Sequence, residues 1–378
     1  MNAFVSPVDP NGLQEFSVVF TDRSLNHMSA TFQEVMRDIH EMLTEVYNTD
    51  HAVVVPGGGT FGMEAIARQF ATDKKVLVVR NGWFSYRWTQ IFEAGDIPAS
   101  STVLKARQMG NESPAPFAPQ DVESVVKTIH EEKPDLVFAP HVETSSGVML
   151  PDTYISQVAK AAHDVGALFV LDCIASGTVW IDMEKLGVDV LASAPQKGWS
   201  SSPSAGLVMM NERAVKRMAD TVSTSFAIDL KKWHDIMQAY LGGGHAYHST
   251  MPTDALRSFR DTMLETKEIG FDLLRDRQLE LGTKVRALLE KRGHKSVAAR
   301  GFEAPGVVVS YTTDPDIQNG KKFAANGTQI AAGVPLMCDE PDDFRTFRLG
   351  LFGLDKLADV DATLARIETA LNNVEEAA

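Results

Sequence analysis

Short apolar runs alternate with segments of helical periodicity between about residue 30 and residue 211 of this 378-residue chain. The runs include Ala52-Val53-Val54-Val55, Val76-Leu77-Val78-Val79 and Leu136-Val137-Phe138-Ala139. Runs of this kind, separated by helical segments, are typical of strands in a parallel sheet. The pattern therefore predicts an α/β fold with a mostly parallel central sheet flanked by helices.

Two of the intervening segments carry their apolar residues on one helical face. The positions are Val122, Val125, Val126 and Ile129 in the first segment and Ile155, Val158, Ala159 and Ala162 in the second. Gly166 follows the second segment, and glycine commonly ends a helix. We expect both helices to pack their apolar faces against the sheet.

The pattern changes after Pro252. A long polar helical stretch continues to about Lys291, and two strand-like runs follow at residues 306–311 and 344–349, before a closing amphipathic helix at about 357–371. This mixture predicts a smaller α+β domain. We therefore expect an N-terminal arm (1–29), a large domain (30–252) and a small C-terminal domain (253–378).

Composition and charge narrow the classes of protein. A hydrophobic fraction of 44% and a charged fraction of 23% are ordinary for a globular protein. The net charge is −14 and the basic residues are dispersed, which argues against nucleic acid as a partner. Only two cysteines, Cys173 and Cys338, are present, so neither a zinc cluster nor a disulfide framework is expected. The chain has no apolar window long enough to span a membrane and no leader-like start, and we expect a cytoplasmic protein.

A lysine and an aspartate at strand ends carry the clearest chemistry. Lys197 follows the buried run 188–192, and a lysine held against apolar surface has a lowered pKa and can form a Schiff base with an aldehyde. Asp172 ends another apolar run 25 residues upstream and could pair with the ring nitrogen of pyridoxal phosphate. The alternative is a surface lysine after a turn and an aspartate that caps the next helix.

A glycine run marks a candidate phosphate site. Gly57-Gly58-Gly59-Thr60 follows the first apolar run and precedes a helical segment, where backbone N–H groups and the helix dipole can hold a phosphate. A tight turn is the alternative. The spacing fits neither a dinucleotide fingerprint nor a P-loop, so a single phosphate is the better match.

Two further strand ends add aromatic and hydroxyl groups. Residues 81–88 contain aromatics that could stack on a flat cofactor, although aromatic residues more often pack in cores. Residues 141–147 supply several hydroxyls just after a strand, where ligands collect in open α/β sheets. Four successive strand ends thus offer stacking, hydroxyl, carboxylate and amine groups, the set that pyridoxal phosphate requires.

The order of these motifs resembles that of the class V aminotransferases, in particular the alanine–glyoxylate and serine–glyoxylate branch. The resemblance covers about residues 30 to 372. The motifs that carry it are Gly58-Gly59-Thr60 before Met63-Glu64-Ala65, Asn81-Gly82-Trp83-Phe84, Glu143-Thr144-Ser145-Ser146-Gly147, Leu171-Asp172, Gln196-Lys197, Tyr247-His248-Ser249-Thr250 and Phe347-Arg348-Leu349-Gly350.

The resemblance implies a fold-type I homodimer that binds pyridoxal 5'-phosphate between domains and subunits. It assigns the Schiff base to Lys197, the contact with the ring nitrogen to Asp172 and ring stacking to Phe84. It also assigns a hydroxyl near the ring's polar edge to Thr144 and binding of the substrate carboxylate to Arg348. The phosphate ligands that it implies are Gly58, Gly59, Thr60 and Gln196 of one subunit and Tyr247 and Thr250 of the other. Gly58 stands where relatives often have serine, so backbone N–H groups or the partner subunit must compensate.

The function implied is transfer of an amino group from a small amino acid, of the alanine, serine or aspartate type, to a small 2-oxo acid such as glyoxylate or pyruvate. Alternatives with the same cofactor are a 2-aminoethylphosphonate transaminase and a carbon–sulphur lyase. Cys338 is the one cysteine placed for lyase chemistry, and a packed thiol is its simpler interpretation, while Cys173 is expected to be inert. A non-catalytic cofactor-binding scaffold is the remaining alternative, and Lys197 argues against it. The divergent arm, at 8–12 and 26–29, leaves the amino donor open.

Overall fold

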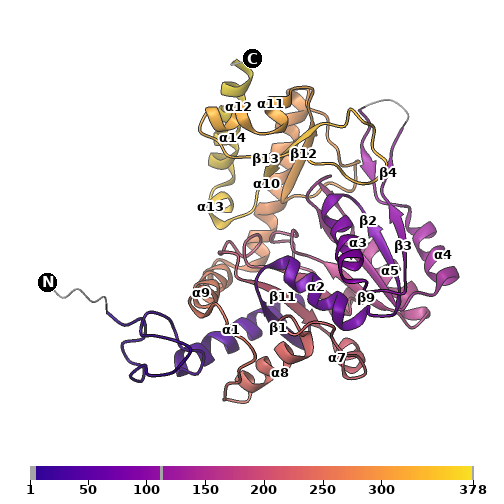
Figure 1. Ribbon diagram of the computed structural model, residues 1–378. Helices are drawn as coiled ribbons and strands as arrows, with labels where there is room; N and C mark the ends of the chain where they lie inside the picture. Colours follow the sequence, from indigo (N-terminus) through magenta and orange to yellow (C-terminus); the bar gives the residue numbers. More distant parts are fainter. Residues whose placement is uncertain (1–5, 111–113, 377–378) are drawn as a thin grey trace.

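A seven-stranded sheet forms the centre of the protein (Figure 1). The computed structural model describes residues 6–110 and 114–376, so the ends of the predicted arm and small domain, 1–5 and 377–378, lie outside it. In spatial order the strands are β1 (His51–Pro56), β11 (Ala205–Met210), β10 (Val190–Ser193), β9 (Leu168–Asp172), β6 (Leu136–Pro140), β2 (Lys75–Arg80) and β3 (Ser100–Lys105).

The sheet is mostly parallel, as the sequence pattern predicts. Strands β10, β9, β6, β2 and β3 run parallel to one another, and β11 alone runs antiparallel to both of its neighbours, β10 and β1. The central strands are buried along their whole length because both faces of the sheet are covered. The parallel strands therefore end at one common edge, where their loops can form a site.

Helices cover the sheet. They are α1 (Ala30–Tyr47), α2 (Gly59–Phe70), α3 (Trp83–Gly95), α4 (Val122–Glu132), α5 (Asp152–Asp164), the short α6 (Met183–Leu186), α7 (Glu212–Ala219) and α8 (Leu230–Leu241). The two predicted apolar faces are those of α4 and α5, whose buried residues include Val125, Ile129, Ile155 and Val158. Gly166, with φ of +82°, follows α5 in the left-handed conformation that glycine adopts without strain.

A second, smaller core lies at the C-terminal end (Figure 1, top). It is built from α10 (Phe271–Lys291), the antiparallel sheet β12 (Val307–Tyr311), β14 (Thr346–Gly350) and β13 (Ala331–Ala332), the short helices α11 (Pro315–Gln318), α12 (Lys321–Ala325) and α13 (Leu354–Leu357), and α14 (Val360–Glu376). Phe347 of β14 is fully buried in this core, together with Leu281 of α10 and Leu371 of α14.

Helix α9 (Thr253–Ile269) leads along the chain from the larger core to the smaller one. Its buried residues Leu256, Phe259 and Met263 belong to the larger core. Gly270 separates α9 from α10, whose Leu274 and following apolar residues belong to the smaller core. Side-chain packing therefore changes from one core to the other at Gly270, while the domain division after residue 252 stays a prediction.

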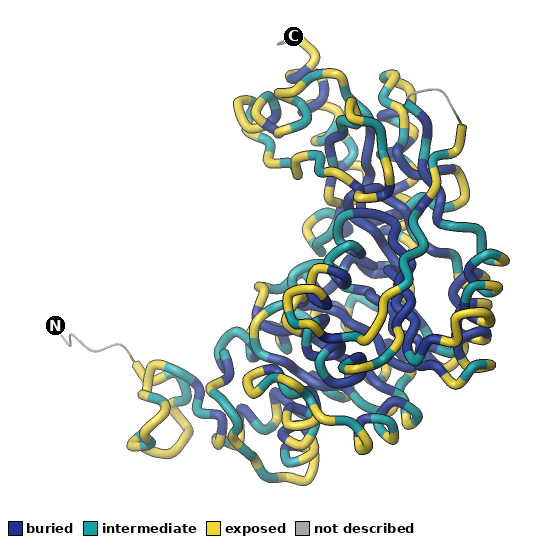
Figure 2. The backbone as a smooth tube through the Cα atoms, turned by 45° about the vertical axis from the view of Figure 1, so that its right-hand side comes forward, coloured by how far each residue is buried: buried dark blue, intermediate teal, exposed yellow. Residues whose placement is uncertain are grey.

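Short hairpins and an extended N-terminal segment complete the fold. The hairpins pair β4 (Arg107–Gln108) with β5 (Phe117–Ala118) and β7 (Val142–Glu143) with β8 (Val148–Met149). Residues 6–29 contain neither helix nor strand. The first part of this segment projects away from the body, and Leu13, Phe16 and Val18 are almost fully exposed, whereas Leu25 is buried in the larger core (Figure 2). In the described residues, every helix is too short or too polar to cross a membrane.

Candidate active site

The predicted chemistry lies at the carboxyl edge of the parallel strands. Asp172 ends β9 and pairs in register with Pro140 at the end of β6 and with Ala192 of β10. Lys197 lies in the turn that follows β10, four residues after the strand ends. Because three neighbouring strands end together, residues far apart in the sequence can converge on one ligand.

Lys197 points between two aromatic rings. Its Nζ atom lies 6.0 Å from the ring centroid of Phe84 and 5.4 Å from that of Phe352. Burial lowers the pKa of the amine, an effect that the nearby Asp172 carboxylate partly opposes. The amine is therefore easier to deprotonate than that of an exposed lysine, as a nucleophile or proton carrier must be.

Asp172 is a buried carboxyl group rather than a helix cap. Its Oδ1 atom accepts a hydrogen bond of 3.0 Å from the amide of Ile174, and the next helix, α6, begins at Met183 with Asp182 as its cap. Burial raises the pKa of Asp172 to about 6, and the charge of Glu143 adds to the rise. The negative charge of a carboxylate in this buried setting is not fully compensated, and a protonated ring nitrogen would compensate it.

Phe84 is the aromatic residue around which the charged groups gather. The Cζ atoms of Arg87 and Arg348 lie 5.2 and 5.5 Å from its ring centroid, in addition to Lys197 Nζ. Its neighbour Trp83 instead lies 5.5 Å from the ring of Tyr86. Phe84 thus offers a ring face beside Lys197 on which a flat cofactor could stack.

Glu143, in the hairpin after β6, fixes the start of helix α3. Its fully buried carboxylate accepts hydrogen bonds from the amides of Phe84 and Ser85, at 3.2 and 2.8 Å, and from the Ser85 hydroxyl at 2.8 Å. Ser145 supports the arrangement, since its hydroxyl accepts from the amide of Trp83 at 2.8 Å and donates to Glu143 at 2.7 Å. A carboxylate at a helix N-terminus is favourable because it satisfies free N–H groups and opposes the helix dipole. Glu143 belongs to the motif 143–147, and its role at the start of α3 is not evident from the sequence.

Arg348, in the middle of β14, reaches from the small core to the large one. Its Nε atom donates to the Ala332 carbonyl at 2.7 Å, and its Nη1 atom donates to the Thr144 carbonyl at 3.3 Å. Neither bond is a salt bridge to Asp342 or Asp343, the acidic residues that lie close to Arg348 in the sequence. The two bonds hold the guanidinium plane and leave its Nη2 edge available for a carboxylate. Thr144 itself is buried.

The glycine run forms the N-terminus of α2, as the sequence predicts for a phosphate site. Gly58 is the cap residue and provides no side-chain hydrogen bond, so the first N–H groups of the helix are available to an anion. A Cβ atom at Gly59 would lie 2.7 Å from Ile174 Cδ1, whereas one at Gly58 would meet open space. Among the described residues the buried Ser201 hydroxyl has no hydrogen-bond partner and could donate to an anion, whereas the unpaired atom of Gln196 is the acceptor Oε1. The uncapped N–H groups at the start of α2 therefore fit a site for a phosphate group.

Tyr247 and Thr250 lie together on the surface. The Tyr247 hydroxyl is 3.1 Å from Thr250 Oγ1, and the Tyr247 side chain is 54% exposed. The ring of His27, just before α1, lies 5.4 Å from that of Tyr247. The structure places this pair beside the N-terminal arm and joins it to Lys197 by no described contact.

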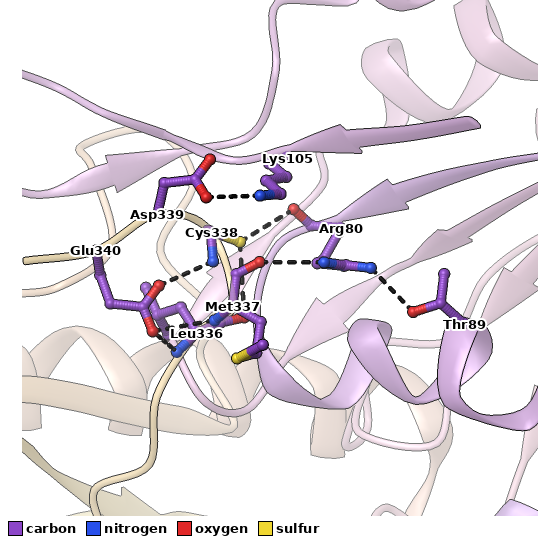
Figure 3. A network of polar contacts seen from close by, with 8 residues as sticks. All are labelled: Arg80, Thr89, Lys105, Leu336, Met337, Cys338, Asp339 and Glu340. Atoms are coloured by element: carbon purple, nitrogen blue, oxygen red, sulfur yellow. Dashed lines mark hydrogen bonds and ion pairs between the residues drawn. The ribbon is translucent and has the colours of Figure 1, made fainter. Parts of the chain in front are cut away.

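Cys338 lies in a network of polar contacts between the two cores (Figure 3). The Glu340 carboxylate accepts from three successive amides, those of Leu336, Met337 and Cys338, which closes the segment into a tight loop. The Cys338 thiol donates to the carbonyl of Arg80, and burial raises the pKa of this thiol to about 12. A buried, protonated thiol is a poor nucleophile. In residues 6–110 and 114–376, no cluster of three or more side chains has the arrangement of a metal site.

Comparison with known proteins gives a consistent result. Residues 14–316 match the family described as Aminotransferase class-V. Over 351 residues the chain is 25% identical to a bifunctional phosphonoacetaldehyde hydrolase/aminoethylphosphonate transaminase of Clostridioides difficile, a match that spans 87% of this chain but only 50% of that longer protein. It is also 25% identical over 329 residues to alanine–glyoxylate aminotransferase 1 of Saccharomyces cerevisiae, covering 82% of each chain.

A solved structure shows the same fold. The alanine–glyoxylate aminotransferase of Nostoc sp. superposes with a TM-score of 0.76 at 21% identity, over 92% of this chain and 89% of that chain. The comparison covers nearly the whole chain and shows the shared fold.

Proposed function

The chain belongs to the class V aminotransferases, which depend on pyridoxal 5'-phosphate, and we propose that it transfers the amino group of a small amino acid to a small 2-oxo acid such as glyoxylate or pyruvate. The observation that carries the proposal is the position of Lys197 Nζ beside the Phe84 ring, with Arg348 5.5 Å from the same ring. An amine, a stacking face and a carboxylate-binding arginine around one space are what amino transfer between carboxylates needs.

The residues present fit the cofactor. Its aldehyde and electron-accepting ring supply the chemistry that amino-acid side chains lack. The amine of Lys197 would bind the aldehyde carbon and, once displaced, carry a proton to and from the substrate carbon, which its lowered pKa favours. Asp172 would hold the proton on the ring nitrogen, and Phe84 would stack on the ring.

The remaining predicted residues complete this assignment. Thr144 would supply a hydroxyl at the polar edge of the ring. Gly58, Gly59 and Thr60 at the start of α2, together with Gln196, would hold the phosphate through N–H and side-chain groups. Arg348 would bind the substrate carboxylate with the guanidinium edge that its two main-chain bonds leave open.

We further propose that the protein works as a homodimer with shared sites. Tyr247 and Thr250 are exposed side by side, and the arm that approaches them exposes Leu13, Phe16 and Val18. Apolar residues exposed in this way favour a partner surface, and a two-fold contact would bring each Tyr247–Thr250 pair to the other subunit's phosphate site. A cytoplasmic location stays a prediction.

Of the alternatives, carbon–sulphur cleavage is disfavoured by the burial and raised pKa of Cys338. Transfer from 2-aminoethylphosphonate keeps support from the name of the Clostridioides difficile relative. The two transaminase functions would use the same lysine, ring face and cofactor, so only the amino donor distinguishes them.

The test is a single-turnover experiment with a panel of amino donors. Alanine, serine, aspartate and 2-aminoethylphosphonate are each mixed with the purified enzyme, and the change of cofactor absorbance is followed together with the keto product. We expect conversion with at least one small amino acid in the wild type and none in Lys197→Ala. Conversion by 2-aminoethylphosphonate alone would replace the proposed substrate class, and conversion by Lys197→Ala at the wild-type rate would refute the site.

A further inference from the structure

The phosphate ligands assigned so far are all uncharged. They are glycine N–H groups, hydroxyls and an amide, from Gly58, Gly59, Thr60, Gln196, Tyr247 and Thr250. A bound phosphate ester carries between one and two negative charges near neutral pH, and the N-terminus of one helix contributes the equivalent of only about half a positive charge. A phosphate in this partly buried place would therefore lack a full counter-charge.

Arg87 is the cation that lies next to this place. Its Nη1 atom donates a hydrogen bond of 3.2 Å to Thr60 Oγ1, in the first turn of α2. Because the Thr60 oxygen accepts this bond, its own O–H proton remains free to be donated to an anion. Arginine and threonine together thus present donors beside the open N–H groups of the helix.

The guanidinium of Arg87 has no acidic partner in the part of the chain that the structure describes. Among the described residues, no carboxylate lies within 4.0 Å of it. Arg348, the other arginine near Phe84, is held instead by the carbonyls of Ala332 and Thr144. An arginine that is half-buried without an acidic partner is poised to receive an anion.

Helix α3 presents Arg87 and Phe84 together. The two residues are three positions apart and lie on one face of the helix, with the guanidinium 5.2 Å from the Phe84 ring centroid. The start of α3 is fixed by the buried carboxylate of Glu143. The same rigid turn can therefore set both the stacking face and the position of a cation beside the phosphate.

We infer that Arg87 is a charged ligand of the cofactor phosphate, which it holds jointly with Thr60 and the N-terminus of α2. This assignment also gives a physical reason why Gly58, which offers no side-chain donor, is tolerated at the helix cap. The inference rests on the proposed placement of the cofactor at Lys197.

The test compares two ligands that differ only in the phosphate. Apoenzyme of the wild type, Arg87→Gln and Arg87→Lys is titrated with pyridoxal 5'-phosphate and with pyridoxal, and binding is followed by absorbance. Loss of one charge-assisted hydrogen bond predicts that Arg87→Gln weakens pyridoxal 5'-phosphate binding by roughly 10- to 100-fold. Pyridoxal binding should change by less than about twofold, because pyridoxal has no group for Arg87 to hold. Arg87→Lys, which keeps the charge but not the fork, should lie between wild type and Arg87→Gln.

Arg68→Gln is the matched control. Arg68 lies on α2 and pairs with Glu64 at 2.7 Å, away from the helix N-terminus, so its loss should leave both affinities unchanged. An equal weakening of both ligands in Arg87→Gln, or no weakening of either, would overturn the inference, because the first result indicates a structural role and the second no role. If Arg87→Gln does not fold, as judged by melting of the apoenzyme, the comparison of the two ligands in Arg87→Lys decides in the same way.

A separate measurement distinguishes failure of this inference from failure of the proposed site. Wild-type enzyme is reduced with borohydride and digested, and the peptide that carries the cofactor is identified. Cofactor on Lys197 supports the site, so that an unaltered Arg87→Gln would then refute Arg87 alone. Cofactor on another lysine would refute the placement from which Arg87 is argued.

Discussion

Arg348 donates to the main-chain oxygen of Thr144 at 3.3 Å, which ties strand β14 of the small core to the loop that follows β6 in the large core. A second bond, from Nε to Ala332, holds the guanidinium from its own sheet. The arginine therefore has a fixed plane at the junction of the two cores, beside Phe84 and Lys197. A carboxylate bound by Arg348 would be positioned relative to both cores at once.

This geometry predicts a selective defect in Arg348→Lys. A single ammonium cannot reproduce two parallel hydrogen bonds, so we expect kcat/KM for amino acids to fall roughly 10- to 100-fold. Primary amines without a carboxylate should react at nearly the wild-type rate. Steady-state kinetics with both kinds of donor provide the measurement.

Arg345→Lys serves as the control for that experiment. Arg345 lies three residues away and donates to the Thr313 carbonyl at 2.8 Å in an exposed position, so its replacement should leave both classes of donor unaffected. Unchanged amino-acid kinetics in Arg348→Lys would indicate that Arg348 only joins the two cores.

The sheet could be predicted from the sequence because its signal is local. Each apolar run between helical segments is a buried strand in the structure. Because parallel strands end at one edge of the sheet, Asp172 and Lys197 lie at the same edge. The antiparallel strand β11 could not be predicted in the same way, since its apolar residues have the same pattern as those of the parallel strands. Its direction depends on the turn around Lys197, and hydrophobic periodicity does not predict the geometry of a turn.

The parts of the site that the sequence did not reveal are contacts between distant elements. Glu143 caps α3 from 59 positions away in the chain, and Arg87 reaches Thr60 across 27 positions. Phe352, which lies 5.4 Å from Lys197 Nζ, comes from the loop between β14 and α13, 155 positions away in the chain. The signal available for Glu143 was an acidic residue close after an apolar strand and next to several hydroxyl residues. A carboxylate in such a place is rarely buried unless several donors bind it.

Because Asp172 is buried, we expect removal of its carboxylate charge to stabilise the apoprotein. The folded pKa, about 6, is above the ordinary aspartate value of 3.8, so this group's contribution to stability is fully present below pH 3.8 and is lost as the pH rises through 6. We expect the Asp172→Asn apoprotein to be more stable than wild type at pH 8 by about 2–3 kcal/mol, with little difference near pH 4. The same variant should lose most transamination, because an amide cannot hold the ring proton by charge. Thermal melting between pH 4 and 8 checks the stability.

Asp189→Asn is the control with the opposite sign. Burial of Asp189 alone would raise its pKa, but hydrogen bonds from His163, the Phe169 amide and Asn211 outweigh burial and lower it. Its contribution is present above the unfolded value and lost as the pH falls, so Asp189→Asn should be less stable than wild type at pH 8. If Asp172→Asn also lost stability at pH 8, the carboxyl group would not be strained in the apoprotein.

Shared sites predict complementation between two inactive variants. Lys197→Ala lacks the amine, and the Tyr247→Phe/Thr250→Ala double variant lacks the proposed phosphate ligands of the partner. In a mixed dimer one of the two sites has all three residues intact, so an equal, fully exchanged mixture should recover roughly a quarter of wild-type activity. Activity is measured after exchange of differently tagged subunits. A mixture with proven exchange and no gain would show that each subunit builds its site alone.

Among the polar residues outside the reacting groups, we expect substitution of Glu143 to destabilise the protein most. Its carboxylate accepts from two amides of α3 and from the hydroxyls of Ser85 and Ser145. In Glu143→Gln one oxygen becomes an NH2 group that faces N–H donors, and a main-chain amide cannot turn away. We expect a loss of about 2–3 kcal/mol in unfolding free energy, measured by denaturant titration.

The same change should weaken cofactor binding, because the first turn of α3 carries Phe84. Glu131→Gln on α4 makes the same chemical replacement in an exposed pair with Lys127 at 3.7 Å, and it should alter stability by less than about 0.5 kcal/mol. Cofactor affinity measured in both variants shows whether weaker binding in Glu143→Gln results from a displaced α3 or from the loss of a negative charge. Were Glu143→Gln as stable as Glu131→Gln and as tight toward the cofactor, the start of α3 would have to be held by Ser145 and main-chain bonds alone, and Glu143 would have no part in placing Phe84.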